Sequence, residues 1–260
     1  MDLRVNAYRE QSSDQGSAPT EEMSSFARHV YALLERTEYR RCESGEDFEN
    51  IYRLRYNSYR MNSLVPESAS RMVHDHFDEL PNCHTFGIYV DDRLVSTLRL
   101  HNVSAEMPMS PALSVYQDLL TPRLAAGEVF IDPSRFAVDV EWSRVYPPIP
   151  YITLRLAGMA CFHFNAPFCI SMIREDHAAF YKRIYRARAI GDARPYGGVI
   201  NCFALLYQAD VLAIKNETYA RFPFFKSTPM EQRLMFGKPP KGELAPLTIL
   251  PTAKYYREAA

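Results

Sequence analysis

The pattern of hydrophobic and polar positions in the first hundred residues predicts two helices and a β-hairpin. Apolar residues recur every three or four positions over 21–34 and 46–60, which is typical of amphipathic helices. Two apolar runs, 84–91 and 93–103, meet at two consecutive aspartates, and this short polar joint predicts a hairpin. The segment 61–83 has no period, and a loop of this length in a compact domain is more often functional than idle.

The second half of the chain alternates strands with helices. Strands are expected over 128–139, 168–173, 188–194 and 201–208, and helices over 151–164, from 175 and over 211–221. The helix over 151–164 is apolar on nearly all sides, which indicates that it is buried. Antiparallel strands early and strand–helix–strand units later favour an α/β fold with a mixed, mostly antiparallel, twisted sheet and helices on both faces.

The strand over 128–139 carries an acid, a hydroxyl and a guanidinium in its middle. Period-2 alternation places Asp132 and Ser134 on one face and Arg135 on the other. Pro133 cannot donate to a sheet ladder, so a break or bulge is expected at that residue. A buried charge is costly unless it is paired, and a strand that holds two charges is therefore a candidate functional site.

Composition narrows the class of protein. The chain has 260 residues, 47% of them hydrophobic and 23% charged, which is ordinary for a globular protein of enzyme size. The net charge of −1 gives no general attraction to nucleic acid, and no apolar run reaches the ~18 residues of a membrane span. The cysteines show no metal-ligand spacing, so we expect reduced thiols, no metal site and a cytoplasmic protein.

Three segments differ in composition. Residues 1–20 are rich in Ser, Gln, Asp and Gly without an apolar period, so we expect a disordered leader. Residues 21–222 carry the predicted helices and strands and are expected to form a single domain. Residues 223–260 are rich in Pro and Lys and poor in core material, so this tail is expected to wrap the surface.

Four short motifs then follow one another along the chain. They are Leu54-Arg55-Tyr56-Asn57-Ser58-Tyr59, Asp75-His76-Phe77-Asp78, Leu98-Arg99-Leu100 and Asp132-Pro133-Ser134-Arg135-Phe136. In this order they resemble the signature of acyl-homoserine lactone synthases, and their variants are more similar to the related long-chain N-acyl amino acid synthases. The resemblance covers 45–210. It implies a GNAT-like fold and an enzyme that moves a long fatty acyl group from an acyl carrier protein to the α-amine of an amino acid, with an aromatic amino acid among the options.

The chain departs from the wider group in two places that bear on its substrates. Asp132 stands where the lactone synthases usually have Glu, and 60–70 lacks the Trp that they carry. Ordinary GNAT acetyltransferases place a Gly-rich pyrophosphate loop after this strand, whereas 139–147 contains no Gly. Backbone N–H groups cradle a pyrophosphate poorly without glycine. The missing glycine therefore favours the phosphopantetheine arm of a carrier protein over coenzyme A as the acyl donor. We expect no tightly bound cofactor.

Acylation of an amine by a thioester has three chemical needs: removal of a proton from the ammonium, donors for the oxyanion, and an acid for the leaving thiolate. Asp132, with Ser134 beside it, is our candidate for the first; a structural cap at the Pro133 bulge is the alternative. Backbone amides near the strand irregularity are expected to serve the oxyanion. The resemblance to GNAT enzymes implies Tyr181 as the acid, and simple packing is its alternative.

The resemblance also implies a substrate-binding cluster. In the lactone synthases and their relatives the matching positions form one charge network. The resemblance therefore implies a network of Arg55, Asp75, Asp78, Arg99 and Arg135, and Tyr59 accompanies Arg55 in the same motif. Three guanidiniums and two carboxylates leave a positive charge that suits the carboxylate of an amino acid. Surface salt bridging of little energetic value is the alternative.

Two further groups of side chains are candidates for binding the acyl carrier and the acyl chain. A basic patch that would steer an acidic carrier protein consists of Lys182, Arg183, Arg186, Arg188 and Arg194. A slot for the acyl chain is expected among Met159, Phe162, Phe168, Met172 and Phe180. A solvated helix face and ordinary core packing are the alternatives. His163 and His177 have no partner at metal-ligand spacing and are expected to be structural core or boundary residues.

Two other functions compete with N-acyl amino acid synthesis. A homoserine lactone synthase would share the motifs and would use S-adenosylmethionine as its acceptor substrate. A GNAT-like module without catalytic activity would only bind the acyl carrier.

Overall fold

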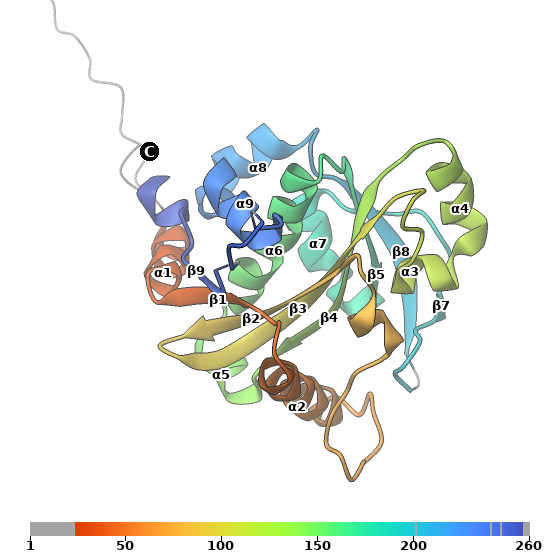
Figure 1. The fold of residues 1–260 in the computed structure, drawn as a ribbon, viewed down its shortest axis with the longest axis horizontal. Coiled ribbons are helices and arrows are strands. Elements are labelled where there is room, and N and C mark those ends of the chain that lie inside the picture. The colour runs from red at the N-terminus through yellow and green to blue at the C-terminus, as the bar shows by residue number, and fades with distance from the viewer. Residues whose placement is uncertain (1–23, 201, 240, 245, 257–260) are drawn as a thin grey trace, which may run out of the picture.

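The computed structural model describes residues 24–200, 202–239, 241–244 and 246–256 (Figure 1). At its centre is a sheet with the strand order β6-β8-β5-β4-β3-β2-β1-β9, and β7 pairs with β8 beside this row. The strands are β1 (Thr37–Arg41), β2 (Cys83–Val90), β3 (Arg93–Val103), β4 (Phe130–Val138), β5 (Phe168–Ile173), β6 (Arg188–Ala189), β7 (Arg194–Pro195), β8 (Phe203–Asp210) and β9 (Thr248–Ile249).

The pairing directions confirm the predicted mixed, mostly antiparallel sheet. β4 and β5 run parallel, and the other strand pairs are antiparallel. The hairpin predicted from the two aspartates joins β2 to β3. Asp91 and Asp92 have φ angles of 47° and 61°, the left-handed conformation that a two-residue hairpin turn of this twist requires.

Helices cover both faces of the sheet, as predicted (Figure 1). In this view α1 and α6 to α9 lie above the sheet, α2 lies below it, and α3 and α4 lie to the right. The helices are α1 (Ser25–Leu34), α2 (Gly45–Met61), α3 (Pro111–Val115), α4 (Gln117–Ala125), α5 (Val140–Val145), α6 (Ile149–His163), α7 (Ala178–Tyr185), α8 (Lys215–Arg221) and α9 (Pro229–Phe236). Short 3-10 turns are η1 (His76–Glu79), η2 (Glu175–His177), η3 (Pro223–Phe225) and η4 (Ala253–Tyr256).

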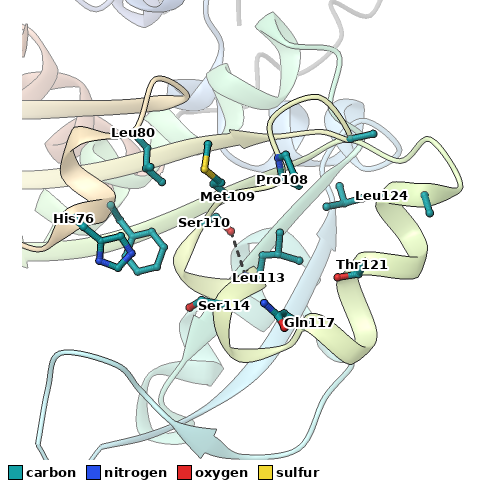
Figure 2. A pocket seen from close by; sticks show the side chains of 13 residues that line it. His76, Leu80, Pro108, Met109, Ser110, Leu113, Ser114, Gln117, Thr121 and Leu124 are labelled. Atoms are coloured by element: carbon teal, nitrogen blue, oxygen red, sulfur yellow. Dashed lines mark hydrogen bonds between the residues drawn. The ribbon is translucent and has the colours of Figure 1, made fainter.

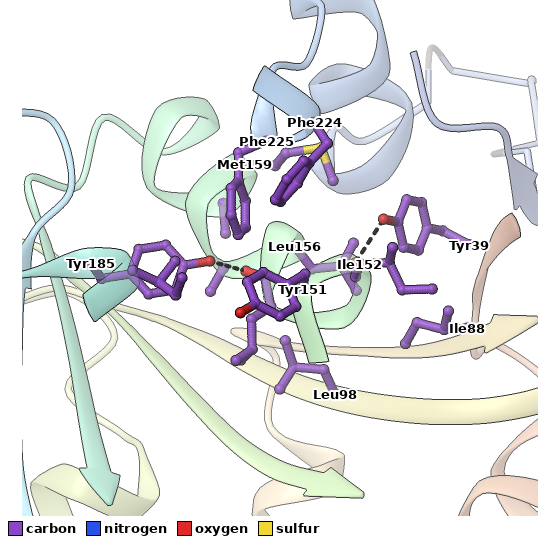
Figure 3. Packing of buried hydrophobic residues seen from close by; sticks show 14 of the residues in the cluster. Tyr39, Ile88, Leu98, Tyr151, Ile152, Leu156, Met159, Tyr185, Phe224 and Phe225 are labelled. Atoms are coloured by element: carbon purple, nitrogen blue, oxygen red, sulfur yellow. Dashed lines mark hydrogen bonds between the residues drawn. The ribbon is translucent and has the colours of Figure 1, made fainter. Parts of the chain in front are cut away.

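Helix α6 is the centre of the main hydrophobic core (Figure 3). Twelve of its 15 residues are buried, as its apolar sequence predicts. Tyrosines from other elements bond to its main chain: Tyr39 Oη donates to the Ile152 carbonyl at 2.7 Å, and Tyr185 Oη donates to the Leu154 carbonyl at 2.9 Å. These bonds fix α6 against β1 on one side and α7 on the other.

The C-terminal segment is part of this core, so the prediction that it only wraps the surface is wrong. Phe224, Met235 and Ile249 are at most 2% exposed, and β9 pairs with β1. Arg155 of α6 donates from Nη2 to Glu231 Oε2 of α9 at 2.8 Å, in a fully buried ion pair. The segment has few apolar residues, but some of them belong to the main core, which its composition does not reveal: Phe224, Phe225, Met235, Phe236, Ile249 and Ala253.

The predicted leader at 1–20 lies outside the described residues, as does the predicted start of the first helix. The described part of that helix begins at Ser25, and Ser24 Oγ accepts from the Ala27 N–H. Among the described residues, no helix has the length and apolar character needed to cross a membrane.

Candidate active site

Strands β4 and β5 separate soon after they meet. In the described chain they pair at Phe130–Phe168 and Ile131–Cys169 alone, and beyond these pairs a cavity of about 150 Å³ lies between them. We call this cavity the β4–β5 cleft. The polar side chains in its walls include Ser134, Arg135, Ser171, His177, Tyr181 and Tyr196.

A β-bulge in β4 forms one edge of this cleft. In the pairing with β3, Leu98 alone faces two residues, Arg135 and Phe136. Pro133 still pairs with Leu100, so the prediction of a break at Pro133 is wrong. A proline is tolerated there because, in the part of the chain that the structure describes, β4 no longer pairs with β5 at that point.

The bulge also changes which way Arg135 points. Its φ angle is +52°, a conformation that costs a non-glycine residue roughly 1–3 kcal/mol and persists only where the surroundings hold it. Ser134 Oγ accepts from Arg99 Nε at 3.0 Å, and Arg99 and Arg135 both bind Asp75. Ser134 and Arg135 therefore reach one cluster, and the prediction that they point to opposite faces is wrong because the bulge interrupts the alternation.

The five charged residues of the motifs form one network, as predicted. Asp75 binds Arg99 at 2.6 Å and Arg135 at 2.5 Å. Asp78 binds Arg55 at 2.9 Å and Arg99 at 3.0 Å. The three guanidiniums and Asp78 are buried, so the alternative of surface salt bridging is excluded.

Local structure positions the members of this network. Asp75 caps η1 by accepting from the Phe77 N–H at 3.0 Å, and Asp78 accepts from the Asp75 N–H at 3.1 Å. Burial by itself raises the pKa of both carboxyls, but the neighbouring guanidiniums outweigh burial and hold each pKa below its usual range. Both carboxylates are therefore ionised at neutral pH and are poor proton acceptors.

Arg55 and Arg135 keep N–H groups for another partner. Three guanidiniums against two carboxylates leave one positive charge in the network. Among the described residues, no protein atom accepts from Nε and Nη2 of Arg55 or from Nη1 of Arg135. Arg135 lines the cleft and lies within 6.0 Å of the Tyr59 ring. Nη1 of Arg135 is thus a buried donor without an acceptor among the described residues, on a residue that lines the cleft.

Asp132 is buried and turns toward α3, so it does not line the cleft as we expected. Its Oδ2 accepts from the Ala112 N–H at 2.7 Å, and burial, opposed by the bonds from Ala112 and Ser110, raises its pKa to about 6. Asp132 thus holds the start of α3 against β4. It is a structural cap, although at α3 and not at Pro133.

Three aromatic or imidazole side chains in the cleft wall bear on proton transfer. Tyr181, our candidate for the acid, lines the cleft, and burial raises its pKa. Tyr196 lies near Arg135, and burial raises its pKa to about 12. His177, which we expected to be structural, also lines the cleft. The sequence did hold a signal for His177, because it precedes Tyr181 by four residues and thus shares its side of the helix.

The predicted acyl slot is wrong, because its five side chains lie in different places. Met172 lines the cleft. Met159 is fully buried against Arg155, and Phe162 packs against Tyr219. The other two also pack elsewhere: Phe168 lies under Arg123, and Phe180 lies against Tyr151. Their common apolar character reflects the core that surrounds α6 and β5.

The predicted basic patch is also divided. Arg186 is paired with Glu217. Arg194 is paired with Asp118 at 2.7 Å and stacks on the Tyr116 ring in the smaller core beside α3 and α4. The ammonium group of Lys182 instead lies over the ring of Tyr207, and this tyrosine belongs to the main core. Lys182, Arg183 and Arg188 are exposed and remain the candidates for contact with a carrier protein.

The segment after β4 offers no backbone site for a pyrophosphate. Asp139 caps α5, and its carboxylate accepts from the N–H groups of Glu141 and Trp142, each at 3.0 Å. At the start of α6, the N–H groups of Tyr151 and Ile152 both donate to the Pro148 carbonyl. The N–H groups that bind an anion at a helix start are thus already occupied here.

A second groove of about 490 Å³ lies between η1, the loop before α3, and α4 (Figure 2). Leu80, Pro108, Met109, Leu113 and Leu124 give it apolar walls. It is larger than the β4–β5 cleft, but none of the predicted site residues lines it. The smaller cleft is our candidate active site because Arg135 of the network, the bulge and Tyr181 meet there.

Comparison with known proteins identifies the family. The family model of the N-acyl amino acid synthase FeeM matches residues 50–210, more than half of the chain. The solved structure of FeeM, an N-acyl amino acid synthase from uncultured soil microbes, is 20% identical with a TM-score of 0.60, covering 72% of this chain and 98% of that one. No curated protein matches the chain.

Two acyl-homoserine lactone synthases are also similar in structure. LasI is 12% identical with a TM-score of 0.49, covering 67% of this chain and 89% of its own. The CoA-dependent enzyme BjaI, solved with SAM and isopentyl-CoA, is 14% identical with a TM-score of 0.48, covering 69% of this chain and 83% of its own. The family match and the GNAT-like fold together identify the chain as an N-acyltransferase that belongs to the FeeM family of N-acyl amino acid synthases.

Proposed function

We propose that the protein transfers a long fatty acyl group from an acyl carrier protein to the α-amine of an amino acid, in the β4–β5 cleft. The observation that carries this proposal is Arg135, which lines the cleft at the bulge of β4 and whose buried Nη1 has no acceptor among the described residues. Arg135 binds the acceptor's carboxylate, which leaves the α-amine in the cleft beside the thioester. A carrier-protein donor places the reaction in the cytoplasm.

The reaction forms an N–C bond and breaks the C–S bond of the thioester. Beyond Ile131, the edge of β4 that faces β5 has no strand partner in the described chain, so its backbone N–H groups are available to the oxyanion. The leaving thiolate takes a proton from Tyr181, whose raised pKa keeps the phenol protonated. Ser134 acts indirectly, because its hydroxyl holds Arg99 in the network.

The carrier-protein donor is supported by the structure around α5. Asp139 occupies the N–H groups at the start of this helix with its own carboxylate, and a second negative charge there would be repelled. A phosphopantetheine arm needs no pyrophosphate cradle. Lys182 and Arg183, exposed on α7 near the cleft, are available to an acidic carrier protein.

The acceptor side of the cleft suits a large side chain. Tyr59, Leu64, Met172 and Val199 line the cleft together with Arg135. These apolar and aromatic walls favour an aromatic or large aliphatic amino acid over a small or acidic one.

One experiment tests donor and acceptor together. The purified protein is incubated with myristoyl-charged carrier protein or myristoyl-CoA and a mixture of the standard amino acids, with and without S-adenosylmethionine, and the products are identified by mass spectrometry. We expect N-myristoyl amino acids from the carrier thioester. Equal rates with coenzyme A would contradict the donor assignment, and a lactone formed only with S-adenosylmethionine would contradict the acceptor assignment.

Replacement of Gly198 by alanine is expected to lower acyl transfer at least tenfold. Gly198 has a φ angle of +76°, and a Cβ there would lie 2.5 Å from Nη2 of Arg135. The added methyl group strains the backbone and pushes Arg135 out of place. Gly197 is the matched control, because a Cβ at that position meets nothing within 4 Å. Equal activity of the two variants would show that Arg135 does not need this close contact.

Replacement of Asp132 by asparagine is expected to remove a pH-dependent loss of stability. The folded-state pKa of about 6 exceeds the ordinary 3.8, so the folded protein binds the extra proton. Stability contributed by this group is therefore present below pH 4 and falls as the pH rises through 6, by on the order of 3 kcal/mol. Urea unfolding of both proteins at pH 4 to 8 measures the difference. Parallel curves would contradict the raised pKa.

A further inference from the structure

The reaction needs a proton acceptor in the cleft, and Asp132 does not stand there. The α-amino group of a free amino acid has a pKa well above 7, so the acceptor enters mostly as an ammonium and must lose a proton before it attacks. Asp132 lies behind the strand with its Oδ2 bonded to the Ala112 N–H. Asp75 and Asp78 are held ionised by three guanidiniums and do not line the cleft.

Most titratable groups that do line the cleft cannot take a proton near neutral pH. The guanidiniums of Arg135 and Arg174 stay protonated. Tyr181 and Tyr196 are phenols whose pKa burial raises, so they are donors. Burial also raises the pKa of the Cys202 thiol. Among the described residues of the cleft wall, this leaves one imidazole, that of His177.

The position of His177 suits this task. It ends η2, directly after β5 and one helical turn before Tyr181, and its side chain is 63% exposed at the mouth of the cleft. The carboxylate of Asp176 lies 3.9 Å from its Nε2. The other charged and titratable groups near it are Arg174 and Glu175 beside it, Tyr181 on α7, and Tyr196 and Cys202 from the segment before β8.

We propose that His177 is the catalytic base that takes the proton from the acceptor's ammonium. This inference rests on the proposed acyl transfer in the β4–β5 cleft. The ammonium gives one proton to the imidazole, and the free amine attacks the thioester carbonyl. As the tetrahedral intermediate collapses and the C–S bond breaks, Tyr181 gives its proton to the leaving thiolate. The second proton of the nitrogen then passes to the Tyr181 phenolate and restores the phenol. The imidazolium then returns its proton to solvent.

The test uses the full-length protein, myristoyl-charged carrier protein and the amino acid that the wild type acylates best. The variants are His177→Gln, His177→Ala and the control His163→Gln, which alters an imidazole of α6 outside the cleft. We expect kcat to fall at least tenfold in both His177 variants and to stay within twofold in the control. Because a bound ammonium must then lose its proton to solvent, the acidic limb of the kcat–pH profile moves up toward pH 8.

Added imidazole separates a base from a structural residue. We expect added imidazole to raise the kcat of His177→Ala at least fivefold and to leave the kcat of the wild type unchanged. If the wild type acylates amino acids and His177→Gln keeps both its rate and its pH profile, the assignment of the base is overturned while the proposed function stands. If the wild type forms no N-acyl amino acid, the proposed function fails first.

Discussion

Replacement of Glu231 by alanine is expected to lower the free energy of unfolding by about 3–5 kcal/mol, because it leaves a buried charge without its partner. Arg155 of α6 and Glu231 of α9 are each 1% exposed. Arg155 also donates to the carbonyls of Phe224 and Lys226, but these bonds do not neutralise its charge. The pair joins the C-terminal segment to the core helix, so its loss also loosens α9.

Urea unfolding followed by circular dichroism measures this effect. The control is Glu49→Ala, which removes an exposed partner of Arg53 on α2 and is expected to cost about 0.5 kcal/mol or less. A double variant, Arg155→Met with Glu231→Leu, removes both charges and is expected to recover most of the loss. Equal losses for Glu231→Ala and Glu49→Ala would show that the buried pair does not stabilise the fold.

Replacement of Arg135 by lysine is expected to raise the KM for the amino acid about 10- to 100-fold. A hydrogen bond between charged groups is worth roughly 1.5–3 kcal/mol, and lysine cannot present the planar donors of a guanidinium. Lysine keeps the positive charge next to Asp75, and Asp75 keeps its bond to Arg99. The charge of the network therefore stays the same, while the unpaired Nη1 donor of Arg135 is lost.

Steady-state kinetics with varied amino acid and saturating carrier thioester measure this change, and thermal unfolding checks that the variant is folded. Arg123→Lys is the matched control, because Arg123 binds Glu128 at 2.6 Å outside the cleft. We expect its KM to match the wild type. An Arg135→Lys variant with an unchanged KM would remove Arg135 from the acceptor site.

The secondary structure and the charge network followed closely from the sequence. Periodicity predicted the hairpin at Asp91 and Asp92 and the buried helix α6, because local backbone preferences and an all-round apolar surface leave few alternatives. The network of Arg55, Asp78 and Arg99 was predicted from the resemblance of short motifs. Buried charges need partners, so motifs that place charges in strands and on the buried face of a helix must bring them together.

The sequence by itself therefore determined the α/β architecture, the family and the set of charges that meet at the site. Only the tertiary structure decided which groups line the β4–β5 cleft. The bulge at Arg135 breaks the alternation on which face predictions depend, Asp132 turns to α3, and His177 reaches the cleft from another element. The packing of the C-terminal segment into the core was also decided by the tertiary structure. Each of these outcomes depends on contacts between residues distant in the chain, and a local pattern of apolar and polar positions does not encode them.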